Sequence, residues 1–292
     1  MEKCVKKAYA KINLGLDVID RLPNGYHEVK MVMQTVGIYD VLTLEKIPEG
    51  IVVTTDNGEL PTDENNLIYK SAKLMKEKYS IQEGVRIHLE KNIPIAAGMA
   101  GGSTDAAATF IGMNELFELG ATEEELRKLG VKVGADVPYC IMGGTALAEG
   151  IGEDLSPLPA PQECFLLIAK PDINVSTKYV YEHLDAEGVK KHPDIEGMIE
   201  ALKQGSLEGI VERLGNVLEN VTVKKYPVIQ KIKENMLENG SLGSLMSGSG
   251  PTVFGMFDEK ETAEKALEAL KATGLAKQLF VTGFAKGGMY AG

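Results

Sequence analysis

The sequence has few cysteines, no tryptophan and no long apolar run. Cys4, Cys140 and Cys164 are odd in number and widely spaced, so they predict neither a disulfide framework nor a zinc site. The longest apolar runs, such as 164–169, are far shorter than the roughly 18 residues that a membrane span requires. The N-terminus also lacks the apolar core of a signal peptide. We therefore expect a reduced, cytoplasmic protein without a metal cluster.

An excess of basic residues is missing too. The 292 residues include 31 Lys and Arg against 42 Asp and Glu, which gives a formal net charge of −11. Proteins that hold DNA or RNA by the phosphates need a basic face, so this balance predicts no nucleic-acid partner. It leaves room for a local pocket that binds a phosphorylated small molecule. Glycine is the residue in excess, with 32 of 292 or about 11% against a usual value of roughly 7%.

A proline-rich stretch at 156–163 reads as a linker. Before it, we expect strands at 5–19, 29–36, 41–46, 51–55 and 85–91, and helices at 66–79, at 103–119 and from Thr122 onward. After it, we expect helices at 176–184, 194–203, 206–219, 226–238 and 260–272, and strands at 165–170, within 244–257 and at 278–285. The elements mix without regular βαβ alternation, which predicts an α+β protein with domains 1–158 and 159–292.

A cluster of glycines lies between a predicted strand and a predicted helix. Gly98, Gly101 and Gly102 precede Ser103 and Thr104, either of which is a natural helix N-cap. Glycines let backbone N–H groups converge, and a helix start adds free N–H groups and the positive end of its dipole, so the cluster predicts a phosphate site. A tight turn without a ligand is the simpler alternative. The chain contains no GxxxxGK[ST] loop, no GxGxxG fingerprint and no HRD or DFG signature.

Two further stretches support a phosphate site weakly. In GADVPYC (134–140), Asp136 lies at a predicted helix start, where an aspartate is often only a cap. In SLMSGSGPT (244–252), Gly248, Ser249 and Gly250 form a second turn rich in backbone donors, although such a turn is usually only a hairpin.

Three stretches resemble the three motifs of the GHMP kinase superfamily, in the right order. They are YAKINLGLDV (9–18), PIAAGMAGGSTDAA (94–107) and SLMSGSGPTVFGMF (244–257). The resemblance implies a two-domain fold, with a glycine-rich phosphate loop in a mixed β/α N-terminal domain and a ferredoxin-like C-terminal domain. It also implies ATP and Mg²⁺ as cofactors and leaves the oligomeric state open.

The resemblance further assigns residues to the phosphoryl-transfer site. It implies that Lys11 steadies charge and that Asp136 is the general base, whereas a strand lysine is otherwise usually solvated. No residue is assigned as a metal ligand, and Asp105 is explained by the helix dipole alone. The implied ATP-binding residues are Pro94, Ile95, Ala96, Ala97, Gly98, Met99, Ala100, Gly101, Gly102, Ser103, Thr104 and Asn66, although N-capping explains Asn66 equally well.

A substrate linked to cytidine diphosphate is implied by RLPNGYHEV (21–29). His27 would read the base edge while Tyr26 and Tyr181 stack on its faces, although turn formation and helix packing explain these residues too. The other implied substrate contacts are Asn13, Gly248, Ser249 and Gly250. Two alternatives stay open: a kinase of the same superfamily that acts on homoserine, mevalonate or a sugar, and a non-catalytic metabolite sensor on the same fold.

Overall fold

The computed structural model describes residues 1–23, 25–184, 189 and 191–285. Asn24, within the stretch RLPNGYHEV (21–29), lies outside the described residues. In the described part of the chain no helix is long and apolar enough to cross a membrane.

Two very long antiparallel strands form the centre of the first sheet. β1 (Lys3–Arg21) and β2 (His27–Ile47) pair along almost their whole length, with register shifts that include one between Tyr9 and Lys11. The seven-stranded sheet is completed by β3 (Ile51–Thr55), β4 (Gly84–Glu90), β5 (Thr145–Glu149), β6 (Asp154–Pro157) and β8 (Gly215–Asn216).

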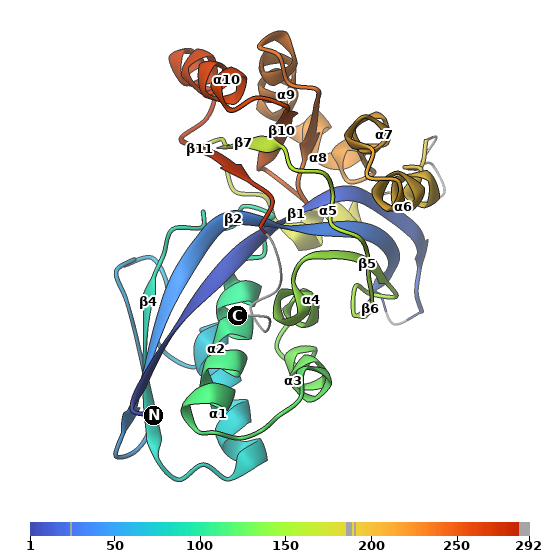
Figure 1. The fold of residues 1–292 in the computed structure, drawn as a ribbon. Helices are drawn as coiled ribbons and strands as arrows, with labels where there is room; N and C mark the ends of the chain where they lie inside the picture. Colours follow the sequence, from blue (N-terminus) through green and yellow to red (C-terminus); the bar gives the residue numbers. More distant parts are fainter. Residues whose placement is uncertain (24, 185–188, 190, 286–292) are drawn as a thin grey trace.

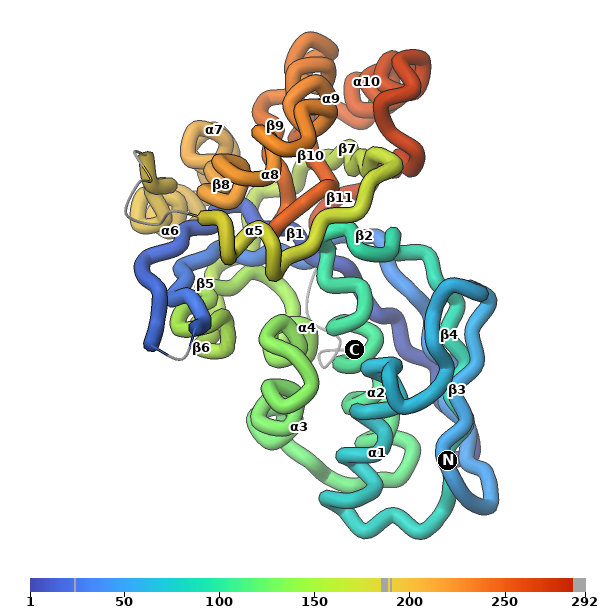
Figure 2. Tube along the Cα trace, turned by 180° about the vertical axis from the view of Figure 1, so that it is seen from behind, coloured from blue at the N-terminus to red at the C-terminus, as the bar shows by residue number. Residues whose placement is uncertain are grey.

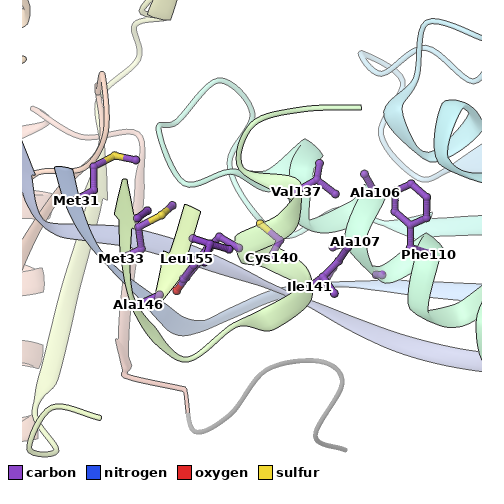
Figure 3. Packing of buried hydrophobic residues seen from close by; sticks show 14 of the residues in the cluster. Met31, Met33, Ala106, Ala107, Phe110, Val137, Cys140, Ile141, Ala146 and Leu155 are labelled. Atoms are coloured by element: carbon purple, nitrogen blue, oxygen red, sulfur yellow. The ribbon is translucent and has the colours of Figure 1, made fainter. Parts of the chain in front are cut away.

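Helices cover one face of this sheet in the lower part of Figure 1. They are α1 (Leu67–Tyr79), α2 (Gly101–Leu116), α3 (Glu123–Gly130) and α4 (Val137–Met142). Val137, Cys140 and Ile141 of α4 lie beside the small side chains of Ala106 and Ala107 on α2 (Figure 3). These alanines let the two helices approach closely, and the start of α4 is thereby held near the start of α2.

The second sheet has four antiparallel strands in the order β11-β7-β10-β9. Its strands are β7 (Phe165–Lys170), β9 (Gly243–Met246), β10 (Val253–Phe257) and β11 (Gln278–Gly283). Two amphipathic helices pack on it, α9 (Val228–Glu238) and α10 (Lys260–Thr273). If these four strands are numbered 1 to 4 along the chain, their order in the sheet is 4-1-3-2, which is the order of a ferredoxin-like sheet. The family resemblance implies such a domain.

The remaining helices lie where the two sheets meet (Figure 2). They are α5 (Thr177–Glu182), α6 (Ile195–Lys203), α7 (Leu207–Glu212) and α8 (Glu219–Lys225). α6 contacts β1 and β2, and β8 pairs with β1 through Gly215 and Asn216. The later half of the chain therefore contributes a strand to the first sheet, and the boundary at 158/159 stays a prediction.

Several predicted elements need correction. The helix predicted at 206–219 ends at Glu212, because residues 215 and 216 instead extend to pair with β1. The segments 29–36 and 41–46 are parts of one strand, β2. The start of the predicted linker belongs to β6, which pairs only with β5, and an edge strand tolerates Pro157. The α+β class and the capping box of Thr122 with Glu125 are confirmed.

Candidate active site

A cleft of about 1060 Å³ lies between the first sheet, the glycine-rich loop and α5. Most of the predicted site residues line it, from the catalytic pair to the second glycine turn. Met99, Thr104 and Gly250 do not. Met99 is buried in the core, the Thr104 hydroxyl donates to the Tyr9 carbonyl at 2.8 Å, and Gly250 packs beside Met246. Their predicted ligand contacts have no support in this geometry.

Lys11 and Asp136 meet at the floor of the cleft. Side chains alternate along β1, so Lys11 lies opposite to buried Ile12, on the face toward α2 and α4. The Lys11 Nζ lies 3.7 Å from Asp136 Oδ2, and the two side chains are 6% and 34% exposed. Asp136 precedes α4, but its side chain makes no capping hydrogen bond. Its carboxylate is therefore free to face the cleft.

Asn13 fixes the position of Lys11. Lys11 Nζ donates to Asn13 Oδ1 at 2.8 Å, and the Asn13 amide nitrogen lies 3.5 Å from the Met31 sulfur. Asn13 is fully buried although it lines the cleft. Its oxygen thus accepts one bond from the lysine, and the substrate contact, which stays a prediction, would use the other lone pair of that oxygen or the remaining N–H of the amide.

The glycine-rich loop leads directly into α2. Gly98 and Ala100 have φ values of 72° and 56°, and the helix begins at Gly101, two residues before the predicted cap. Ser103 and Thr104 therefore do not cap α2, which has no side-chain cap. The loop instead places the free N–H groups of a glycine-led first turn at the cleft, the geometry that binds phosphate.

The second glycine turn is fastened to the first. Ser247 Oγ donates to the Gly98 carbonyl at 3.0 Å, and a Cβ on Gly98 would lie 2.3 Å from the Ser247 carbonyl oxygen. Asn216 Nδ2 donates to the Met246 and Gly248 carbonyls at 2.8 and 2.7 Å. The C-terminal part thereby supports the glycine-rich loop, and Gly248 and Ser249 line the same cleft.

An aromatic group lines the opposite end of the cleft. The rings of His27 and Tyr181 lie 5.2 Å apart at 42°, whereas Tyr26 is 58% exposed beside them. Burial, and secondarily the charge of Arg21, lower the pKa of His27. Burial raises the pKa of Tyr181. A neutral imidazole and a neutral phenol are thus available for hydrogen bonds with a heterocyclic base.

Asn66 is the N-cap of α1, at the end of the cleft beside the glycine-rich loop. Its Oδ1 accepts from the Ile68 N–H at 2.8 Å, so the N-capping prediction is confirmed, and its amide donates to the Pro61 carbonyl at 2.6 Å. Leu60 and Leu67 line the cleft beside it. This apolar end fits the face of a base.

The sequence did not point to Lys91 or Asp40, and it explained Asp105 by the helix dipole; the three form a buried cluster at the back of the loop. Lys91 Nζ lies 2.5 Å from Asp40 Oδ2 and 2.7 Å from Asp105 Oδ2. Asp105 lies beyond the first turn of α2 and pairs with Lys91, so the helix dipole does not account for it. The one signal for Asp40 was that it is a charged residue inside the apolar run of β2.

Comparison with known proteins identifies the family. The profile described as "GHMP kinases N terminal domain" matches residues 66–144, and "GHMP kinases C terminal" matches residues 198–276. A protein of Lachnospira eligens named 4-diphosphocytidyl-2-C-methyl-D-erythritol kinase is 56% identical over 283 residues, which cover 97% of this chain and 98% of the relative. The chain belongs to the GHMP kinase family.

Other relatives agree with this membership. A protein of Caldicellulosiruptor bescii with the same name is 52% identical over 94% of this chain and 96% of its own. A solved structure of 4-(cytidine 5'-diphospho)-2C-methyl-D-erythritol kinase has a TM-score of 0.83 at 32% identity, covering 97% of this chain and all of that one. A homoserine kinase from Cytophaga hutchinsonii, with a TM-score of 0.80 at 22% identity over 99% and 96% of the two chains, shares the fold. This GHMP kinase is a small-molecule kinase that uses ATP.

Proposed function

We propose that this GHMP kinase transfers the γ-phosphoryl group of ATP to the 2-hydroxyl of 4-diphosphocytidyl-2-C-methyl-D-erythritol. The observation that carries the proposal is the placement of three groups in one cleft: the glycine-rich loop, the Lys11–Asp136 pair, and the aromatic end around His27 and Tyr181. The names of the relatives at 52–56% identity support the same substrate. The resemblance assigns such a step to the methylerythritol phosphate route to isoprenoids, in the cytoplasm.

In the proposed reaction, the substrate hydroxyl oxygen attacks the γ-phosphorus and the bond to the β,γ-bridging oxygen breaks, which releases ADP. Asp136 accepts the hydroxyl proton as the general base. Lys11, held by Asn13, stabilises the charge that develops on the transferred group. The N–H groups of the glycine loop and of the start of α2 hold the phosphates.

Mg²⁺ would neutralise phosphate charge in this reaction. In the described part of the chain, no three His, Cys, Asp or Glu residues gather into a metal-binding group. Such an environment fits an ion that is bound mainly by phosphate oxygens and water, as Mg²⁺ commonly is in phosphoryl-transfer sites. The chain's own part is to position those phosphates through the glycine loop.

The proposed substrate pocket uses the ring pair. A cytosine base would lie against His27 and Tyr181, where neutral rings stack and offer hydrogen bonds, and Tyr26 would close over it from the exposed side. Nothing comparable is needed for homoserine or mevalonate, which carry no base. The aromatic end therefore favours the cytidyl alcohol over these alternatives.

An ADP-release assay with a panel of alcohols tests the proposal. We expect ADP to form with the cytidyl substrate, and only at background rate with homoserine, mevalonate or a sugar. Release with one of those alcohols instead would show a different substrate. Tight binding of ATP and the cytidyl alcohol without any ADP would show the sensor function.

A further inference from the structure

Helix α5 carries one side of the aromatic end of the cleft. Four of its residues line the cleft, at the spacing of a single helical face: Thr177, Lys178, Tyr181 and Glu182. The ring centre of Tyr181 lies 5.2 Å from that of His27, which begins β2. The helix has only six residues, so the direction of Tyr181 depends on what holds this short segment in place.

Few contacts hold the other sides of α5. Val180 is buried in the core and anchors the middle of the helix. Among the described helices and strands, none packs extensively along α5. A single buried side chain near the middle of a short helix leaves the tilt and the rotation of that helix to be set by other contacts. Two such contacts connect α5 with α8 and with the second glycine turn.

The first contact lies at the start of α5. Thr177 Oγ1 and Ser249 Oγ are 2.8 Å apart, and the Ser249 carbonyl accepts a hydrogen bond from Thr222 Oγ1 of α8 at 3.1 Å. α8 is itself fixed to the second sheet, because Glu219 in its first turn accepts from the Met246 N–H of β9 at 2.9 Å. Ser249 thus connects α5 with a firmly supported helix.

The second contact lies on the face of α5 that is turned away from the cleft. Lys225 Nζ, at the end of α8, lies 3.3 Å from the centre of the Tyr179 ring, and α8 lies beside α5 in Figure 2. His183, one helical turn after Tyr179, stacks on the same ring with 3.8 Å between the ring centres and 23° between the planes. An ammonium group over an aromatic ring is attracted by the electron-rich face of the ring. Lys225 therefore ties α5 to α8 at a point that does not touch the cleft.

We propose that Lys225 and Tyr179 are positioning residues of the substrate pocket. Their contact fixes the tilt of α5, and it thereby holds Tyr181 at the distance from His27 that a cytosine base requires. The inference rests on the proposed function, because it takes a cytidyl group to be the occupant of the aromatic end. Neither residue touches the substrate: both act through the position of Tyr181.

Calorimetric titration with cytidine diphosphate (CDP) tests the inference. Lys225→Met removes the ammonium group and keeps an apolar side chain, so we expect the Kd for CDP to rise about two- to fivefold, the range of one exposed cation–π contact. Lys225→Arg keeps a cation over the ring and should bind CDP as the wild-type protein does. Tyr179→Leu should weaken CDP binding at least as much as Lys225→Met, whereas Tyr179→Phe keeps the ring and should restore it.

The ATP analogue AMP-PNP separates positioning from a general loss of structure. The glycine-rich loop is held by Ser247 and not by α5, so the Kd for AMP-PNP should be unchanged in all four variants. The double variant Lys225→Met/Tyr179→Leu should bind CDP no more weakly than Tyr179→Leu, because both changes remove the same contact. Circular dichroism checks the fold of each variant.

Lys224→Met is the matched control for charge. Lys224 is the preceding residue of α8, is exposed like Lys225, and makes no ring contact among the described residues. Its loss removes the same charge from the same helix without touching Tyr179. We therefore expect Lys224→Met to leave the Kd for CDP unchanged.

Four results overturn the inference alone. The first is a Lys225→Met protein that binds CDP as tightly as wild type, and the second is a Lys224→Met protein that is equally weakened. The third is a double variant whose loss is the sum of the two single losses, since Lys225 would then act other than through Tyr179. The fourth is an equal weakening of AMP-PNP binding. A wild-type protein that does not bind CDP overturns the proposed substrate, and this inference with it.

Discussion

Two buried lysines line the same cleft and differ in what surrounds them. Lys11 has one carboxylate at 3.7 Å, and that carboxylate, of Asp136, is one-third exposed. Lys91 has two carboxylates within 2.7 Å, and both are buried. The first lysine is only loosely paired, and in the proposed reaction it would meet the transferred phosphoryl group. The charge of the second is already neutralised inside the protein.

The same cleft thus contains one lysine suited to catalysis and one lysine that holds structural elements in place. Burial alone does not mark a functional lysine, because Lys11 and Lys91 are equally buried. The separation and hydration of the carboxylate partner distinguish them. A loosely paired lysine beside a hydrated carboxylate suits charge stabilisation and proton transfer. A lysine locked between two buried carboxylates fixes the position of the elements that carry them, here β2 and α2.

The largest effect is expected at the partner of Lys11. Asp136→Asn keeps the shape of the side chain but cannot accept the hydroxyl proton, so kcat should fall by roughly 10² to 10⁴. Steady-state kinetics with ATP and the cytidyl alcohol measures it, and circular dichroism checks the fold. A folded variant with near wild-type kcat would show that Asp136 is not the base.

The next largest effect is expected at Lys91. Lys91→Met leaves Asp40 buried without its cation, so the free energy of unfolding should fall by about 3–5 kcal/mol. Urea denaturation of the variant and of the wild-type protein measures the difference. If stability is unchanged while kcat drops, Lys91 is a catalytic group and the contrast with Lys11 fails.

Lys11→Met should give the opposite pattern. We expect kcat to fall by about 10² to 10³ because one charge-stabilising donor is lost. The free energy of unfolding should fall by about 1–3 kcal/mol, less than for Lys91→Met, because buried Asn13 Oδ1 loses its donor while the partly exposed Asp136 carboxylate stays hydrated. The same two assays as for Lys91→Met apply. A large loss of stability without loss of kcat would reverse the assigned roles.

A smaller effect is expected in the glycine loop that both lysines flank. In Gly98→Ala the Cβ meets the Ser247 carbonyl at 2.3 Å and the backbone has φ 72°, so the variant should lose stability and its KM for ATP should rise. Gly120→Ala is the control, since Gly120 has φ 67° with nothing within 4 Å. Its cost should be limited to about 1 kcal/mol. Equal losses in the two variants would show that the contact with Ser247 is unimportant.

The smallest effect concerns the aromatic end, far from either lysine. Arg21→Ala should raise the pKa of His27 part of the way to its ordinary value, because burial remains and only the charge of Arg21 is lost. The lowered pKa of folded His27 means that its contribution to stability is present above the unfolded-state pKa and is lost as the pH falls through the folded one. NMR titration of the histidine ring protons measures the pKa of His27 in the wild-type protein and in Arg21→Ala. The variant His27→Gln assigns the signal. An unchanged pKa would mean that Arg21 is too distant or too well screened to act.

The sequence predicted most of the local structure and much of the cleft. Local signals were sufficient for the capping box at Thr122, for the Asn66 cap and for the strand at 165–170. The helix predicted at 206–219 failed because the short strand at 215–216 exists only through its pairing with β1. Local propensity and periodicity cannot predict pairing with β1, which lies about 200 residues earlier in the chain.

The same limit explains what the sequence missed in the site. Asp40 lies in β2, Asp105 lies in α2 and Lys91 follows β4, so only the fold brings the three within hydrogen-bond distance. Asn13 could be assigned to the site by its motif, but not its bond to Lys11, since that depends on the direction of two side chains on one strand. The motifs therefore predicted which residues line the site, and the structure showed their positions and their charged neighbours.

Phosphorus NMR of the reaction products tests the central claim most directly. With ATP, Mg²⁺ and 4-diphosphocytidyl-2-C-methyl-D-erythritol, the account predicts ADP and an equal amount of a new phosphomonoester on the 2-hydroxyl of the erythritol. Release of inorganic phosphate without the new ester, or no consumption of ATP, would contradict it.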